Sequence, residues 1–91
     1  MTVGIIGLGY VGLTFAIAAA DKGITVYGVE KNQHIVQCLA KRHAHFFEPG
    51  LDDKIDTCTD KRFFCVENFP KDVQFDAFII TVGTPLFEQT K

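Results

Sequence analysis

The sequence predicts an α/β fold in which helices cover a parallel sheet. Four short apolar runs, rich in β-branched and aromatic residues, alternate with segments of helical spacing or with short polar connections. This alternation is typical of parallel strands joined by crossovers. The chain has 91 residues, of which 47% are hydrophobic, and this is enough apolar material for one small domain.

Each expected element begins and ends at recognisable residues. The strands are expected at 3–6, 24–29, 63–66 and 77–82. The first helix is expected over 10–22 and is closed by Gly23, because glycine readily adopts the left-handed conformation that follows a helix. Asn32 is a typical N-cap for a second helix that ends near Lys41, and residues 51–57 favour a short third helix.

Charge and hydropathy exclude several classes of partner. The formal net charge is −2 at pH 7 and no basic stripe is present, so nucleic acids and anionic membranes are not expected as partners. The apolar stretch 3–20 resembles a membrane span or a signal sequence, but glycines interrupt it and no basic segment precedes it. A strand, a tight turn and a helix explain it better, and the expected compartment is the cytoplasm.

The cysteines and histidines do not follow the spacing of a disulfide framework or a metal site. Cys38, Cys58 and Cys65 form no C-x-x-C pair and are odd in number, so we expect reduced, partly buried thiols. His43 and His45 form an H-x-H pair without a cysteine or carboxylate at ligand spacing. We therefore expect solvated loop histidines and no metal.

Residues 7–12 read Gly-Leu-Gly-Tyr-Val-Gly, a G-x-G-x-x-G pattern between the first strand and the first helix. The pattern alone is weak, but its place in a strand-turn-helix-strand unit is typical of dinucleotide binding. Gly7 allows a sharp turn, Gly9 allows the backbone to approach a pyrophosphate, and Gly12 lets the helix lie against the strand. The helix N-terminus offers N–H groups and a positive dipole end to the diphosphate. We therefore expect a Rossmann-type parallel sheet with helices on both faces, here a partial one of about four strands.

Glu30 stands at the carboxyl end of the second strand, 18 residues after Gly12. An acid at this place accepts hydrogen bonds from the adenosine ribose and repels a 2′-phosphate, which favours NAD over NADP. The adjacent Lys31 softens this repulsion. We therefore expect NAD(H) as the ligand, while a solvated charge at a strand end is the alternative interpretation of Glu30.

Several segments resemble the UDP-glucose/GDP-mannose dehydrogenase family. Residues 9–13, Gly-Tyr-Val-Gly-Leu, resemble the opening of that family, and residues 26–30 resemble its second strand. Glu-Pro-Gly-Leu at 48–51 matches a characteristic loop, and residues 81–86 are similar to the segment that ends the fourth strand and touches the cofactor. The resemblance covers nearly the whole chain. Taken with the motif, it implies that NAD is bound by Gly7, Gly9, Tyr10, Val11, Gly12, Glu30, Lys31, Gly83, Thr84 and Pro85.

The resemblance also implies an enzyme of polysaccharide biosynthesis. Members of the family oxidise the C6 hydroxyl of UDP-glucose or a UDP-N-acetylhexosamine to a carboxylate, with two NAD and a thiohemiacetal on a cysteine. Their catalytic residues and UDP-binding domain lie beyond the segment that residues 1–91 match. We therefore expect this chain to be the N-terminal part of the NAD-binding domain, with no catalytic residue, inactive alone and meeting a UDP-sugar only in the full-length enzyme. Ile35 departs from the family, which often has Lys or Arg there.

Two other functions are open. A non-catalytic NAD-sensing module, such as those attached to ion channels and transporters, begins with the same pattern and needs no catalytic residue. A hydroxyacid or 6-phosphogluconate-type dehydrogenase is the second alternative, but such enzymes more often carry methionine in place of Val11 and lack the Glu-Pro-Gly loop.

The fourth strand is expected to have an open outer edge, with Phe78 and Ile80 poorly covered. An exposed parallel strand is a template for pairing with another chain. We therefore expect a homo-oligomer that forms through this edge.

Overall fold

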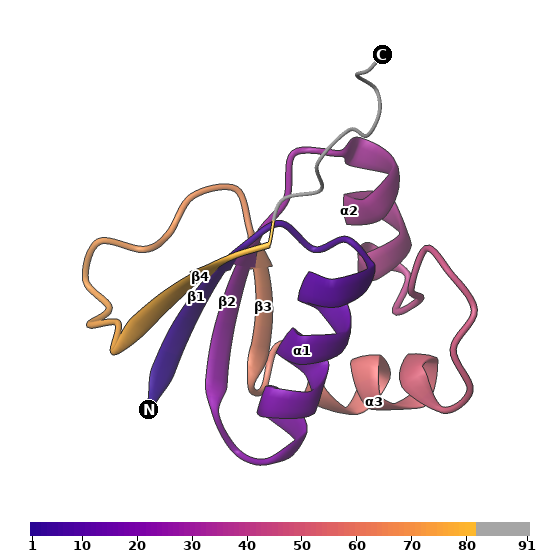
Figure 1. Cartoon of the computed structure of the whole chain (residues 1–91), viewed down its shortest axis with the longest axis horizontal. Coiled ribbons are helices and arrows are strands. Elements are labelled where there is room, and N and C mark those ends of the chain that lie inside the picture. Colours follow the sequence, from indigo (N-terminus) through magenta and orange to yellow (C-terminus); the bar gives the residue numbers. More distant parts are fainter. Residues whose placement is uncertain (82–91) are drawn as a thin grey trace.

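The computed structural model describes residues 1–81, which form one four-stranded parallel sheet with helices packed against it (Figure 1). The strands are β1 (Thr2–Ile6), β2 (Thr25–Val29), β3 (Phe63–Val66) and β4 (Ala77–Ile80). The helices are α1 (Tyr10–Asp21), α2 (Gln33–Ala40) and α3 (Leu51–Cys58). The strand order β3-β2-β1-β4 is parallel throughout, which confirms the expected Rossmann-type fold.

The observed boundaries lie close to the expected ones. Gly23 follows α1 with a φ of 95°, the left-handed conformation expected of a glycine after a helix. The Asn32 side chain caps α2, since its Oδ1 accepts a hydrogen bond of 2.9 Å from the His34 N–H. The expected fourth strand extends to Val82, whereas β4 ends at Ile80, and Val82 lies outside the described residues.

The three helices of the described chain lie on one face of the sheet (Figure 1). Because β1, β2 and β3 follow one another in a single direction across the sheet, their right-handed crossovers fall on the same face. The largest fully buried side chains of the described chain are Phe63, Ile5, Leu8, Leu13, Ile17, Ile55 and Val26. Within residues 1–81 the expected helix on the second face is replaced by a connection without a helix, residues 67–76.

An aromatic cluster covers the second face. It consists of Tyr27, Phe64, Phe69, Phe75 and Phe78. Tyr27 on β2 stacks on Phe64 of β3 with ring centroids 4.9 Å apart, and Phe75 packs edge-on against Tyr27 at 5.5 Å. Gly4 lies beneath the cluster, where a Cβ would collide with the rings of Phe69 and Phe78. These rings therefore cover the sheet where a helix was expected.

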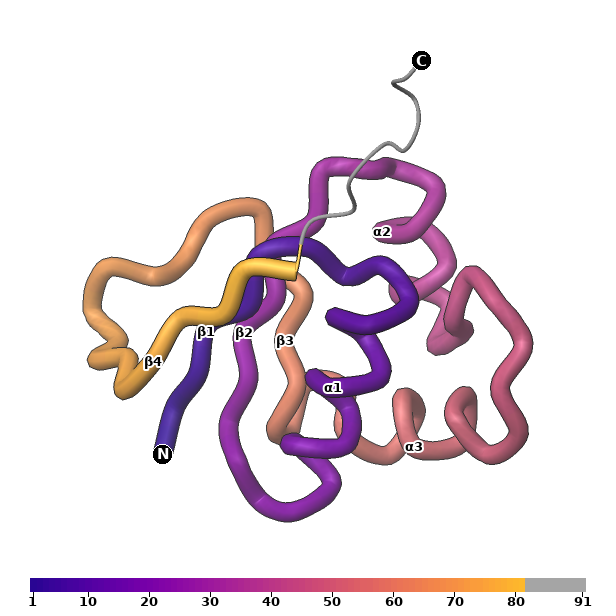
Figure 2. The backbone as a smooth tube through the Cα atoms, in the orientation of Figure 1, coloured from indigo at the N-terminus to yellow at the C-terminus, as the bar shows by residue number. Residues whose placement is uncertain are grey.

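The carboxyl ends of the strands share one edge of the sheet. Figure 2 shows the chain leaving β1 at this edge, turning into α1, and returning to the same edge at the end of β2. β4 also ends there, beside β1. None of the helices in residues 1–81 has the length and apolar character needed to cross a membrane.

Candidate functional site at the carboxyl edge of the sheet

The turn between β1 and α1 begins with a backbone conformation that favours glycine. Gly7 has a φ of 98°, which is costly for any residue with a Cβ. Its N–H donates a 2.9 Å hydrogen bond to the carbonyl oxygen of Val29, so the turn leaves β1 while still attached to β2. The sharp turn expected of Gly7 is present.

Gly9 and Gly12 have opposite surroundings. A Cβ on Gly12 would overlap the carbonyl oxygen of Gly7 and the hydroxyl of Thr81. A Cβ on Gly9 would meet no atom within 4 Å. Gly12 is therefore required for close packing of α1, whereas Gly9 leaves free space on the outside of the turn.

The N-terminus of α1 faces this free space with unused hydrogen-bonding capacity. Gly9 is the N-cap and provides no side-chain cap, and the first helical bond runs from the Leu13 N–H to the Gly9 carbonyl at 2.9 Å. The N–H groups of residues 10–12 precede that bond and point out of the helix end. Tyr10 is 58% and Val11 64% exposed, so an anion can reach these groups and the positive end of the helix dipole.

Glu30 binds the backbone on both sides of the site. Its Oε1 accepts a hydrogen bond of 2.6 Å from the Leu8 N–H, and its Oε2 accepts one of 2.9 Å from the Asn32 N–H. A carboxylate has about four acceptor sites, so both oxygens can still accept hydroxyl groups of a ligand. Glu30 and the exposed Lys31 also line a cavity of about 200 Å³ at this edge.

Leu8 anchors the turn, a role that the G-x-G-x-x-G pattern does not reveal because it leaves this position free. The Leu8 side chain is 0% exposed. It lies against Gly28 of β2, where an added Cβ would come within 2.8 Å of the Leu8 side chain. A glycine in the middle of a strand is a signal for such a close approach, and it could have pointed to this contact.

Thr81 connects the end of β4 to the same turn. Its hydroxyl donates a hydrogen bond of 2.7 Å to the Gly7 carbonyl, and its N–H donates one of 2.8 Å to the Ile6 carbonyl. The three expected cofactor residues that follow, Gly83, Thr84 and Pro85, lie outside the described residues. The sequence indicates the segment 81–86 as a cofactor contact but does not indicate the individual role of Thr81.

Aromatic rings pack beside Tyr10, the first residue of α1. Tyr10 packs against Phe46 with ring centroids 4.9 Å apart, and His45 meets Phe46 edge-on at 4.8 Å. Burial lowers the pKa of His45, and the nearby Glu30 opposes this shift. Within residues 1–81 the buried Nδ1 atom of His45 has no hydrogen-bond partner. The neutral ring is therefore favoured at pH 7.

The two histidines of the H-x-H pair have separate surroundings. His43 contacts Asp52 with 3.3 Å between Nδ1 and Oδ2, and Asp52 also accepts a 2.8 Å hydrogen bond from the Ala44 N–H. The Ala44 bond, followed by the His43 contact, holds the pKa of Asp52 below its usual value. In the described part of the chain, no three His, Cys, Asp or Glu side chains gather as metal ligands.

The three cysteines, all within the described residues, are free thiols. Cys58 is buried, while Cys38 and Cys65 are partly buried, as expected from the sequence. Burial raises the pKa values of Cys58 and Cys65 and keeps these thiols protonated. Neither has the character of a nucleophile.

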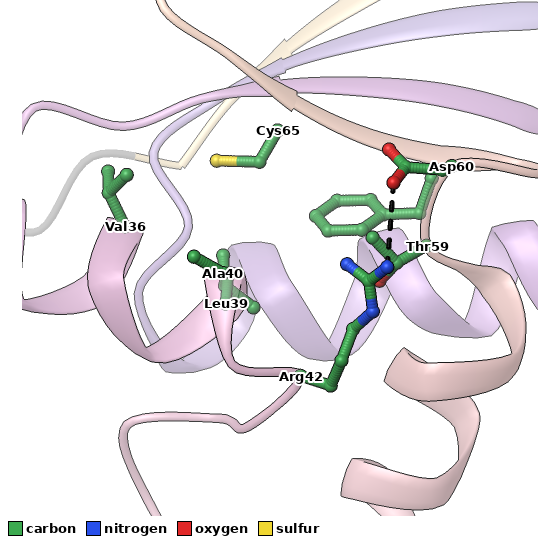
Figure 3. A pocket seen from close by; sticks show the side chains of 8 residues that line it. Val36, Leu39, Ala40, Arg42, Thr59, Asp60 and Cys65 are labelled. Carbon is green, nitrogen blue, oxygen red and sulfur yellow. Dashed lines mark ion pairs between the residues drawn. The ribbon is translucent and has the colours of Figure 1, made fainter.

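A second cavity, of about 190 Å³, lies between α2 and β3 (Figure 3). Its lining includes Cys65 and Arg42, and the Arg42 guanidinium pairs with Asp60 at 3.5 Å across its rim. None of the residues expected to bind the cofactor lines this cavity. The carboxyl edge of the sheet, which brings together Gly7, Gly9, Gly12 and Glu30, is therefore the candidate site.

Known proteins resemble this chain over nearly its whole length. Residues 1–91 match the UDP-glucose/GDP-mannose dehydrogenase family, NAD binding domain. The chain is 41% identical to UDP-N-acetyl-D-mannosamine dehydrogenase of Campylobacter jejuni over 81 residues, which are 89% of this chain and 19% of that protein.

Solved structures of similar proteins share the fold. GDP-mannose dehydrogenase from Pseudomonas aeruginosa matches with a TM-score of 0.82 and 31% identity, over 93% of this chain and 20% of that chain. UDP-glucose dehydrogenase from the archaeon Pyrobaculum islandicum matches with a TM-score of 0.79 and 35% identity, over 92% of this chain and 20% of that chain. This chain thus spans about a fifth of the length of these proteins.

Proposed function

The chain belongs to the UDP-glucose/GDP-mannose dehydrogenase family, and we propose that it holds the adenosine diphosphate part of NAD(H) on the turn between β1 and α1. The observation that carries the proposal is the uncapped N-terminus of α1 beside Gly9, where a ligand has free space. The diphosphate would accept hydrogen bonds from the N–H groups of residues 10–12, and the adenosine ribose would donate to Glu30.

The placement of Glu30 supports a preference for NAD over NADP. Its two backbone hydrogen bonds hold the carboxylate at the end of β2, so it cannot turn away from a 2′-phosphate without losing them. The phosphate of NADP would therefore meet a fixed negative charge. Lys31 lies beside Glu30 and reduces this repulsion without replacing the acid. Gly83, Thr84 and Pro85 are proposed to contact the cofactor beyond β4.

We extend the proposal to the whole enzyme of which this chain would be the N-terminal part. It would be a nucleotide-sugar 6-dehydrogenase that oxidises UDP-glucose or a UDP-N-acetylhexosamine to the uronate with two NAD. The names of the similar proteins, among them UDP-N-acetyl-D-mannosamine dehydrogenase, support this substrate class. Residues 1–91 alone would bind NAD without catalysis. The cytoplasmic location and the role in polysaccharide biosynthesis stay predictions.

Titration of the 91-residue chain with NAD(H) and NADP(H), by calorimetry or NMR, tests the proposal. We expect saturable NAD(H) binding and weaker NADP(H) binding. Glu30→Gln should weaken NAD(H) binding about tenfold, because the amide keeps the shape but loses the charge, and its NH2 group cannot accept from one of the two backbone N–H groups. Glu30→Ala is less informative, since it also frees the N–H groups of Leu8 and Asn32 and so loosens the turn.

Asp72→Asn is the matched control for Glu30→Gln. It makes the same change of charge on an exposed residue of the connection 67–76, which crosses the other face of the sheet. NAD(H) affinity should be unchanged in this variant. A folded wild-type chain that binds no NAD(H), or a Glu30→Gln chain that binds it as well as the wild type, would contradict the proposed site.

We also propose that two copies associate through β4. Within the described residues β4 pairs with β1 alone, and Phe78 and Ile80 are 55% and 68% exposed. Ile80→Lys should shift sedimentation equilibrium toward the monomer, because a lysine on an edge strand opposes pairing with another strand. Phe47→Lys is the control, since Phe47 is 89% exposed but lies far along the chain from β4. A wild-type chain that stays monomeric at high concentration would refute the association.

A further inference from the structure

One peptide unit of the glycine turn is held at both ends by side chains from two different strand ends. The carbonyl of Gly7 accepts a 2.7 Å hydrogen bond from the Thr81 hydroxyl, at the end of β4. The N–H of the same peptide, on Leu8, donates a 2.6 Å hydrogen bond to Glu30, at the end of β2. Because a peptide unit is planar, fixing its oxygen and its N–H fixes the orientation of the whole plane.

This orientation sets the direction in which the chain enters α1. The backbone of Gly7 is permissive, since glycine reaches conformations on both sides of φ = 0. Rotation of the Gly7–Leu8 peptide would turn the Leu8 N–H away from Glu30 and change the direction in which the chain reaches Gly9, the N-cap of α1. The hydrogen bond from Thr81 opposes that rotation because it holds the Gly7 carbonyl oxygen in place.

Thr81 is itself firmly placed. Its N–H continues the ladder between β4 and β1 through the 2.8 Å bond to the Ile6 carbonyl. On the other side its hydroxyl lies where a Cβ of Gly12 would stand, so β4, the turn and the first turn of α1 meet at this one oxygen. The hydroxyl is therefore held in contact with the two segments that shape the anion site.

We propose that Thr81 is a positioning residue for diphosphate binding, which it supports through the Gly7 carbonyl without touching the ligand. This inference rests on the proposed binding of a dinucleotide at the turn. Thr81 would support binding of the diphosphate at the turn, whereas Glu30 would bind the adenosine. The two contributions can be measured separately with one ligand that contains the phosphates and one that lacks them.

The test compares Thr81→Val with Thr81→Ser, using ADP and adenosine as probes. Valine keeps the branched shape and removes the donor, whereas serine keeps the donor. Loss of one hydrogen bond predicts that ADP binds about three- to tenfold more weakly to Thr81→Val. Adenosine affinity should fall less than ADP affinity, because Glu30 keeps its hydrogen bond from the Asn32 N–H. Thr81→Ser should restore ADP affinity. Thermal unfolding of both variants shows whether ADP affinity follows the donor or only the overall stability.

Three outcomes would overturn the inference: unchanged ADP affinity in Thr81→Val, a parallel loss for ADP and adenosine, or no rescue by Thr81→Ser. A wild-type chain that binds neither ADP nor NAD would instead refute the proposed function. Hydrogen exchange of the Leu8 amide, measured by NMR without nucleotide, then decides about Thr81. Faster exchange in Thr81→Val than in Thr81→Ser supports the positioning role, and equal exchange refutes it.

Discussion

Gly12→Ala is expected to destabilise the folded chain by about 1–3 kcal/mol, the range for forcing an extra methyl group into a packed place. The added Cβ would overlap the Gly7 carbonyl and the Thr81 hydroxyl, so α1 would have to move away from the ends of β1 and β4. In a solvent-exposed helix, replacing glycine by alanine stabilises the fold by about 1 kcal/mol. A loss of stability in Gly12→Ala would therefore show that the added methyl group clashes. Chemical unfolding followed by circular dichroism measures the free energy of unfolding.

Gly9→Ala is the matched control for this prediction. Gly9 has a φ of −69°, which alanine adopts without strain, and no atom lies within 4 Å of the added Cβ. The free energy of unfolding should therefore change by less than about 1 kcal/mol, the cost of placing alanine at an N-cap. NAD(H) binding should nevertheless be strongly weakened, because the methyl group occupies the space proposed for the diphosphate. A Gly12→Ala chain as stable as the wild type, or a Gly9→Ala chain with normal NAD(H) binding, would contradict this division of roles.

The parts of the fold that could be predicted from the sequence are those set by nearby residues. The turn was predictable because Gly7, Gly9 and Gly12 each stand where the backbone conformation or a close approach requires a residue without a Cβ. The cap at Asn32 was predictable for the same reason, since a short polar side chain before an apolar helical pattern satisfies N–H groups a few residues away. The place of Glu30 at the carboxyl end of β2 was predictable from the number of residues between the glycine turn and the end of that strand.

Other features depend on contacts between distant segments and were not predicted. The helices lie on one face because β1, β2 and β3 follow one another in a single direction across the sheet. The aromatic cover formed with Phe69 and Phe75 depends on how the connection between β3 and β4 crosses the other face. Glu30 was expected to face a ligand, but nothing local indicates that it also binds the backbone of Leu8, 22 residues earlier. Thr81 reaches Gly7 across 74 positions of the chain. Contacts between residues so far apart in the sequence can be identified only from the assembled sheet.

Leu8→Ala is expected to destabilise the chain by about 2–4 kcal/mol, because a fully buried leucine is replaced by a cavity between the turn and β2. NAD(H) affinity should fall as well, since the Leu8 peptide would lose the anchor that keeps its N–H on Glu30. Val11→Ala, at a position that is 64% exposed, is the control and should change stability by less than about 0.5 kcal/mol. Chemical unfolding measures both variants.

A double-mutant cycle with Gly28→Ala separates loss of this contact from general damage. In the wild type a Cβ at Gly28 would approach the Leu8 side chain to 2.8 Å, so Gly28→Ala alone should destabilise. In the Leu8→Ala background the same methyl group enters the cavity that the leucine has left, and its cost should vanish or reverse. We expect a coupling free energy of about 1 kcal/mol or more. Simple additivity of the two substitutions would show that Leu8 and Gly28 do not fix the turn through their mutual contact.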